Sequence, residues 1–318
     1  MLINFKFFRT GSLLLAGVLT AQCIPAAADS HDQDVQALDK RPEQRAATDR
    51  LLQASADSIP ALLNGLMSSS QQVKTKSLWI LRQIRWKTKS LNDDPIATAI
   101  GNTARMEKDP ALRRNMALAI GDLHGPAAVK ELKRLASEDS DTEVRRIATH
   151  RVATVSSEKE FQFLRKQSAD TSVVVRLAAG IELASLGDPS GRDLALKTVK
   201  ASTDLGERSE AFDLLGAVGN PNDAAILKNA AESKTENFHS RYVAFRAYRH
   251  HQLIQLPSGE RLDYLIKALD DPSADVRDCM YIELYHSPDP NTNSRLRKYL
   301  GEKGHVGYVE AAKALSAR

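Results

Sequence analysis

The side chains best suited to chemistry in this sequence are three histidines in its C-terminal third, His250, His251 and His286. An imidazole can bind Zn²⁺ or act as a general acid or base. Adjacent residues on a helix point about 100° apart, so at most one of His250 and His251 can join a given site. We therefore interpret the three as groove or surface histidines and predict no metal site.

Motifs of known catalytic type are absent from the sequence. It contains no G-x-S-x-G, no phosphate-cradling glycine loop, no C-x-x-C and no H-E-x-x-H. Of the two cysteines, Cys279 is expected to be a packed small residue rather than a reactive thiol. The sequence therefore predicts no catalytic residue and no cofactor, and the protein is not expected to be an enzyme.

A stripe of aromatic and basic residues favours recognition instead. At about 100° per residue, Trp79 and Trp86 fall within about 20° of each other on a helix, with Arg82 between them. No acid occurs from 71 to 90. Trp and Arg dominate many binding energies, so the stripe is a candidate protein-binding patch. The alternative is that both Trp rings pack against a neighbouring helix.

A second candidate patch lies toward the C-terminus, where all seven Tyr occur between 242 and 308. Its members are Arg246, Arg249, His250, Tyr285 and His286. Between the two patches, the equivalent positions hold small or mixed residues, which suggests a groove floor with room for a partner segment. These positions are Leu118, Gly121, Asp122, His150, Ala153, Thr154, Ile181, Ala184, Ser185, Asp213, Gly216 and Ala217.

The element that carries both patches is a repeated fourteen-residue frame, seen best in V-R-L-A-A-G-I-E-L-A-S-L-G-D at 175–188. Apolar residues at its positions five, nine and twelve line one helix face. The frame returns at intervals of 30 to 39 residues, which marks a repeat array. Copies begin at Val73, Leu112, Val144, Val175, Glu207, Ser240, Val276 and Val306.

A shorter apolar helix precedes each copy, which predicts about eight two-helix units. One such unit cannot bury its apolar face alone, whereas stacked units form a solenoid. An Asp and an Arg recur four residues apart at the start of the frame, as in Asp109 and Arg113 or Asp141 and Arg145. We expect a ladder in which each Arg reaches the Asp groups of its own and the adjacent unit.

The frame V-R-x-x-A-A-x-x-L-x-x-L-G-D, led by D-x-x-[VL]-R, resembles HEAT repeats of the short bacterial kind. The match is strongest at 112–125, 144–155, 175–188 and 207–220, and it covers most of 58–318. The resemblance implies an all-α, right-handed α-solenoid whose second helices line a concave face. It implies binding proteins more often than enzymes. No His-Glu dipeptide occurs, so the site of HEAT-repeat di-iron hydroxylases is not implied.

The N-terminal residues resemble a secretory signal peptide at 1–28. Lys6 and Arg9 form a basic start, an apolar run at 11–21 is too short to span a bilayer, and Ala28 suits cleavage. An uncleaved anchor or lipidation of Cys23 are the alternatives. We expect a flexible lead-in at 29–42, with the solenoid at 43–318 and its first helix near 43–53.

Removing residues 1–28 takes away Lys6, Arg9 and no acid, so the formal charge falls from +4 to +2. This balance does not suggest a nucleic-acid partner. The combined prediction is a periplasmic or secreted scaffold that binds another protein along its concave face, with no membrane span after cleavage. The alternatives are a periplasmic immunity or inhibitor protein, and an enzyme or enzyme subunit, similar to the lyase-like HEAT family, that uses groove histidines.

Overall fold

The protein is seen here as a computed structural model that describes residues 27–88, 91–236, 238–302 and 304–317, and every regular element in these ranges is helical. An N-terminal pair, α1 (Ala27–Ala37) and α2 (Arg41–Ala54), precedes eight further helix pairs. The first helices are α3 (Ile59–Gly65), α5 (Asp93–Met106), α7 (Pro126–Glu138), α9 (Phe161–Gln167), α11 (Arg192–Ala201), α13 (Ala224–Glu232), α15 (Ser258–Ala268) and α17 (Thr292–Gly301). The second helices are α4 (Gln71–Lys87), α6 (Pro110–Ile120), α8 (Thr142–Val155), α10 (Val173–Ser185), α12 (Leu205–Val218), α14 (Phe238–Ile254), α16 (Ala274–His286) and α18 (Tyr308–Ala317). The short 3₁₀ helices are η1 (Ser55–Ser58) and η2 (Pro221–Asp223).

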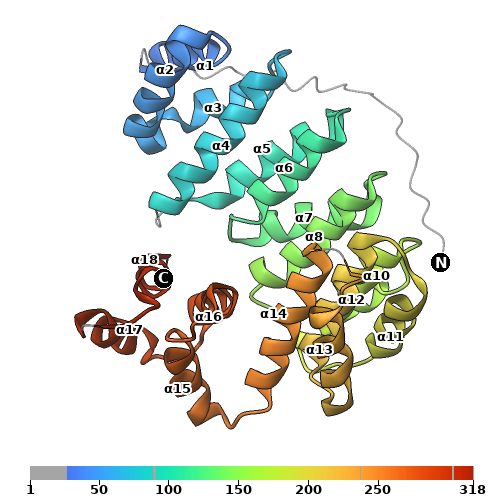
Figure 1. The fold of residues 1–318 in the computed structure, drawn as a ribbon. Helices are drawn as coiled ribbons and strands as arrows, with labels where there is room; N and C mark the ends of the chain where they lie inside the picture. The colour runs from blue at the N-terminus through green and yellow to red at the C-terminus, as the bar shows by residue number, and fades with distance from the viewer. Residues whose placement is uncertain (1–26, 89–90, 237, 303, 318) are drawn as a thin grey trace, which may run out of the picture.

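The helix pairs stack in chain order along a curved path (Figure 1). Each second helix packs against the second helix of the next unit, from α4 through to α18, and so forms a continuous layer. The first helices form the other layer, with contacts such as α3 with α5 and α5 with α7. The predicted all-α solenoid of about eight two-helix units is confirmed.

Acidic residues fix where several second helices begin. The side chain of Asp109 accepts a hydrogen bond from the backbone N–H of Ala111 at 2.9 Å. Asp141 does the same for Val144 at 3.0 Å. These carboxylates satisfy N–H groups that have no partner within the helix, and their charge suits the positive end of the helix dipole.

The arginine that follows four residues later joins neighbouring units. Arg113 donates from Nε and Nη2 to the carboxylate of Asp139, each at 2.8 Å. Arg145 donates in the same way to Asp170, at 2.9 and 3.0 Å. Each acid belongs to the loop of the next unit, so the predicted contact between adjacent units is confirmed.

The expected contact with the Asp of the same unit is different. Arg145 donates from Nη1 to the backbone carbonyl oxygens of Asp139 and Ser140. The carboxylate of Asp141 is engaged elsewhere, because it caps its own helix and accepts two hydrogen bonds from Arg114. The arginine therefore binds the backbone of its own loop and the side chain of the next.

The expectation of a flexible lead-in at 29–42 is wrong. These residues form most of α1, the turn at 38–40 and the start of α2, because Val35 and Leu38 supply two apolar side chains that are buried in the core. A Cβ added at Gly65 would lie 2.7 Å from Val35, which shows how closely α3 approaches α1. The N-terminal cap is therefore a helix pair rather than α2 alone.

The proposed signal peptide and Cys23 lie almost entirely outside the described residues, since the description begins at residue 27. In the part of the chain that is described, no helix has both the length and the apolar character needed to cross a bilayer. At the other end of the chain Val306, where the last frame copy was placed, is exposed, and the buried residues there are Gly307, Ala311 and Ala314.

The buried apolar residues form three clusters along the solenoid. The first runs from Val35 to Val155, the second from Leu177 to Ala247 and the third from Leu253 to Ala314. Polar contacts between adjacent units cross the boundaries. At the first, Arg145 of α8 contacts Asp170 in the loop before α10, and His150 contacts Glu182. At the second, Tyr242 contacts Asp278 and His250 contacts Glu283.

The ladder leads to a stability prediction for Arg145→Met. The guanidinium and its partner Asp170 are only 12% and 11% exposed, so the substitution leaves a largely buried carboxylate unpaired. We expect a loss of about 2–4 kcal/mol in the free energy of unfolding, measured by urea denaturation. Arg165→Met is the matched control, because Arg165 is 65% exposed in its pair with Asp188 and should cost less than about 1 kcal/mol. Equal losses in the two variants would contradict a structural role for the ladder.

Candidate functional site

A cavity of about 510 Å³ lies on the layer of second helices. Its walls come from five consecutive units, α8, α10, α12, α14 and α16, and this is the concave side on which a groove was predicted. We call it the groove cavity. It is lined by Arg146, His150, Ile181, Glu210, Asp213, Gly216, Ala217, Arg246, Ala247, His250, Ile282, Glu283 and His286.

The small residues of the predicted groove floor have a second role. A Cβ added at Gly216 would lie 2.9 Å from the Cβ of Ala247, and one added at Gly121 would lie 2.5 Å from Arg151. These glycines therefore let successive second helices approach each other closely. The open space of the groove lies instead between the larger polar side chains that line the cavity.

One end of the groove cavity holds a network centred on His150. Its Nδ1 lies 2.8 Å from Glu182 Oε1, and its Nε2 lies 3.3 Å from Glu210 Oε2. Arg146 donates to the other oxygen of Glu210 at 2.7 Å. Side chains from α8, α10 and α12 thus form one network of hydrogen bonds and ion pairs that joins three units.

Two acids around one imidazole shift its titration. Burial lowers the pKa of His150, but the hydrogen bonds and charges of Glu182 and Glu210 outweigh burial and raise the pKa to about 9. The imidazole is therefore a cation at neutral pH, with both ring nitrogens acting as donors. Burial also raises the pKa of Glu210, but the hydrogen bond and charge of His150 more than offset this and leave it lowered.

Further along the groove cavity, two more pairs join adjacent units. Arg246 donates from Nη2 to both carboxylate oxygens of Asp213 at 2.7 Å. Burial nevertheless raises the pKa of Asp213, because the ion pair does not fully offset its desolvation. His250 Nδ1 lies 2.8 Å from Glu283 Oε1, and no partner of its Nε2 is found among the described residues.

The structure brings together most of the predicted C-terminal patch. Arg246, His250 and His286 line the groove cavity, and the ring of Tyr285 lies 4.6 Å from that of His286. Arg249 does not line it, because its guanidinium packs over the ring of Tyr264 on α15.

His251 is excluded from the site. It is buried and its Nε2 lies 2.9 Å from the carbonyl oxygen of Asn220. Cys279 is buried too, and burial raises the pKa of its thiol to about 12, which fits the expected packed residue.

The Trp stripe on α4 is exposed. Trp79 is 44% exposed and Trp86 is 57% exposed, so neither ring is covered by a neighbouring helix. Lys76 lies over the ring of Trp79 and Arg82 over that of Trp86, at 5.9 and 5.3 Å from the ring centroids. Arg82 also forms an ion pair with Asp122, which holds the guanidinium in place beside the indole.

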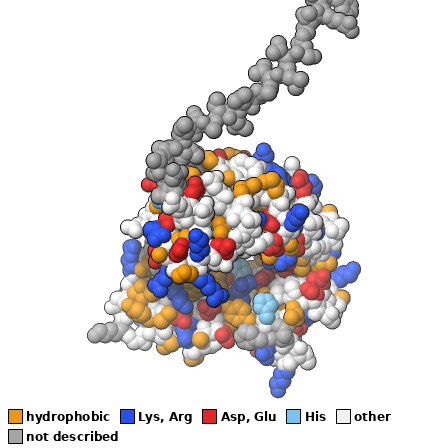
Figure 2. All heavy atoms as spheres, turned by 90° about the horizontal axis from the view of Figure 1, so that it is seen from above, with side chains coloured by type: hydrophobic (Ala, Val, Ile, Leu, Met, Phe, Trp, Pro, Cys, Tyr) orange, Lys and Arg blue, Asp and Glu red, His pale blue; other side chains and the backbone are white. Residues whose placement is uncertain are grey.

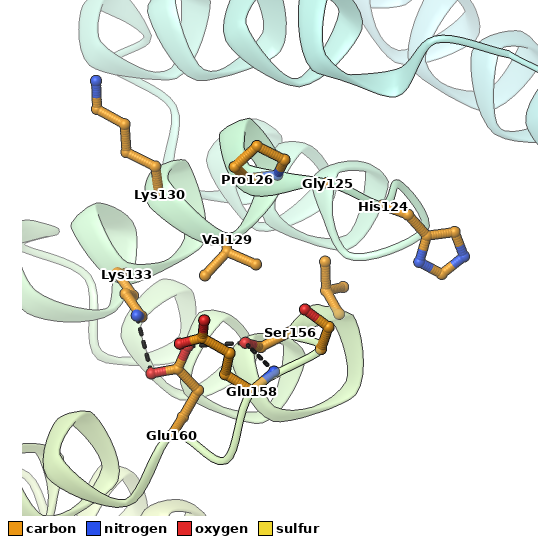
Figure 3. A pocket seen from close by; sticks show the side chains of 11 residues that line it. His124, Gly125, Pro126, Val129, Lys130, Lys133, Ser156, Glu158 and Glu160 are labelled. Carbon is orange, nitrogen blue, oxygen red and sulfur yellow. Dashed lines mark hydrogen bonds and ion pairs between the residues drawn. The ribbon is translucent and has the colours of Figure 1, made fainter.

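A larger cavity, of about 670 Å³, lies between α7 and the loop that follows α8. Figure 3 shows Lys133 and Glu160 directed at each other across its lower side, 2.8 Å apart. Ser156 Oγ donates to the same carboxylate at 2.8 Å. Only neighbouring units contribute to this cavity, whereas five units contribute to the groove cavity, so we regard the groove cavity as the better candidate site.

The acids of the groove were missed in the sequence. Glu182, Glu210 and Glu283 were not singled out, although Glu182 follows His150 by 32 residues and Glu283 follows His250 by 33. That separation is the length of one repeat. A His in one unit followed by a Glu one repeat later is therefore a sequence signal for a His–Glu contact between adjacent units. No cluster suited to a metal ion occurs among the residues with described positions.

Residues 98–174 match the family model described as HEAT repeats. This segment is made of HEAT repeats. The matched segment covers α6, α7, α8 and α9, with parts of α5 and α10. No curated protein matches the sequence.

Solved structures with a similar arrangement include three natural proteins. Escherichia coli YibA is 15% identical at a TM-score of 0.43, covering 86% of this chain and 97% of YibA. The complex of CpcE and CpcF of phycocyanin lyase from Nostoc sp. PCC7120 is 14% identical at 0.35, covering 81% and 94%. Human deoxyhypusine hydroxylase in complex with glycerol is 18% identical at 0.34, covering 87% and 98%. At these identities the similarities say nothing about function.

The raised pKa of His150 makes the stability of the protein depend on pH. The folded-state pKa of about 9 exceeds the ordinary 6.5, so the stabilisation is fully present below about pH 6.5 and is lost as the pH rises through 9. His150→Gln should therefore cost roughly 2 kcal/mol of unfolding free energy at pH 6 and clearly less at pH 10.

The control is His124→Gln, since His124 is exposed and should be indifferent at both pH values. An NMR titration measures the imidazole directly. A value for His150 near 6.5 would show that the two carboxylates do not act on it as described.

Proposed function

We propose that the protein is an exported scaffold that binds a segment of another protein along its concave face. One observation carries the proposal: a single cavity collects side chains from five consecutive units. A segment lying across it would contact all five at once, which is how an extended concave surface builds specificity.

The chemistry of the groove cavity fits a polypeptide. Ile181 and Ile282 offer apolar contacts, while the ion pairs around His150, Arg246 and His250 offer donors and acceptors in fixed positions. These charged groups already satisfy each other, so binding does not require an uncompensated charge to be buried. On the face in Figure 2, basic, acidic and hydrophobic side chains lie intermixed, as suits a protein partner better than a phosphate backbone.

The exposed stripe of Trp79, Arg82 and Trp86 supports a second contact on the N-terminal part of the solenoid. Two large indoles exposed two helical turns apart offer wide apolar surfaces, and the cations above them favour a partner with acidic groups nearby. The stripe lies on α4, in the same layer of second helices as the groove cavity.

One arrangement favours a catalytic alternative. Glu283 holds Nδ1 of His250, which leaves Nε2 available as a proton acceptor in the groove cavity, as in a general base oriented by a carboxylate. His250→Gln separates the two functions: an enzyme would lose its activity, whereas a binding protein would lose only part of its affinity.

Export is part of the proposal. Small residues at Ala26 and Ala28 support cleavage that leaves Asp29 as the first residue. Mass spectrometry of the protein recovered from the periplasm should give the mass of 29–318. A mass that retains Cys23 with an added lipid would contradict this part.

The binding test uses the paired substitution Trp79→Ala and Trp86→Ala. Immobilised protein is exposed to periplasmic extract, and the affinity of the retained partner is then measured with purified components. If the rings are binding hot spots, affinity falls by at least about 2 kcal/mol. The melting temperature should stay within a few degrees, because both rings are exposed.

Met106→Ala is the matched control, since Met106 is 61% exposed but belongs to α5 in the other layer. A partner that binds the Trp variant normally and is lost from the Met106 variant would place the contact on the first helices and refute the concave-face proposal.

A further inference from the structure

A second cavity opens beside the groove. It measures about 450 Å³ and lies between the C-terminal end of α14, the helix α15, and the end of α16 with the loop that follows. We call it the chamber. Its apolar walls are Leu253, Ile254, Leu262, Leu265, Pro288 and Pro290.

Part of the chamber wall belongs to the third apolar cluster. Leu253, Leu262 and Leu265 are buried members of that cluster, so their positions are fixed by core packing. A volume of a few hundred Å³, mostly apolar walls and a few convergent polar groups are the usual features of a site for a small molecule. Three residues, His250, Glu283 and His286, line both the chamber and the groove cavity.

The polar groups of the chamber leave donors unused. Arg261 donates from Nε to the carbonyl oxygen of Leu256 and from Nη2 to that of Ile254, each at 3.0 Å. No carboxylate of the described residues forms an ion pair with it, so this cation at the wall of an apolar cavity is unneutralised. His250 Nε2 and the ring nitrogens of His286 have no hydrogen-bond partner in the described part of the chain.

The two acids at the chamber are already engaged. Glu283 is bound by His250, at 2.8 Å. Asp289 accepts a hydrogen bond from the backbone N–H of Asn291, also at 2.8 Å, just before α17 begins. The positive end of that helix dipole favours its negative charge. Among the charged groups of the chamber, Arg261 thus stands out because it keeps unused N–H groups and has no carboxylate partner among the described residues.

We propose that the chamber binds an aliphatic carboxylate, with its hydrocarbon chain among the leucines and its carboxylate at Arg261 and at the N–H of His286. The chain gains by leaving water for an apolar wall. The carboxylate supplies the acceptor that Arg261 lacks, and arginine is well suited to a carboxylate in two-point contact. This small-molecule site shares three lining residues with the groove cavity, but it does not require a protein segment to be bound there.

The test is isothermal titration calorimetry of the full chain with decanoate, below the concentration at which it forms micelles. We expect one site per chain and at least ten-fold tighter binding of decanoate than of decyltrimethylammonium, which has the same chain and the opposite charge. Decanoate should also raise the melting temperature, because a ligand that binds only the folded state stabilises it.

Two variants locate the site. Ser258→Trp fills the chamber from the exposed start of α15 and should weaken decanoate binding at least ten-fold. Gly259→Trp is the matched control, because a Cβ added at Gly259 meets nothing within 4 Å and Gly259 does not line the chamber. Arg261→Gln should remove the preference for decanoate over decyltrimethylammonium while leaving residual binding of both chains.

Three results would overturn the proposal: no binding of decanoate, unchanged binding in Ser258→Trp, or equal affinity for the cationic amphiphile in the wild-type protein. Because none of these results involves a protein partner, they leave the proposed scaffold function intact.

Discussion

The contact on which the rest of the structure depends is the arginine at the start of a second helix. In Arg113 and Arg145, one guanidinium bonds the backbone of its own loop and the carboxylate of the next unit. Stacked helix pairs share apolar faces that would tolerate small rotations, since apolar contacts have little directionality. A two-point arginine–carboxylate contact does have direction, so it fixes the angle between units and thereby the curvature on which the groove depends.

The second helices have two roles, joining neighbouring units and lining the groove, and the charged side chains for each role lie at different places on them. At the loops, acids and arginines join neighbouring units, while the groove repeats this pairing with His150, Arg246 and His250. Every charged side chain in the groove that comes from one unit is held by an acid or base from another. The groove is thus preorganised, and a bound segment meets polar groups whose rotamers are already restricted.

The fold could be predicted from the sequence because the repeat supplies the same evidence many times. A frame with leucines at fixed positions, such as Leu183, defines a single apolar face on each helix and therefore a single direction in which the units can stack. The site was harder, since it depends on residues one repeat apart that face each other only once the curvature is known. Glu182 and Glu283 lie at position eight of their frames, beside the positions predicted to face the groove, and were therefore overlooked. The prediction of a flexible lead-in at 29–42 was wrong because the local signal was too weak. Two apolar residues, Val35 and Leu38, are too few to show a helical period, but they are enough to anchor a short helix on an exposed core.

The division of the apolar core into three clusters has a mechanical consequence for the groove. Its five helices belong to different clusters, with α8 in the first, α10 to α14 mainly in the second and α16 in the third. Within a cluster, close packing resists deformation. At the two boundaries, hydrogen bonds such as that between His250 and Glu283 can break and re-form with water at small net cost. A segment that spans the groove therefore contacts helices from all three clusters and would tie them together.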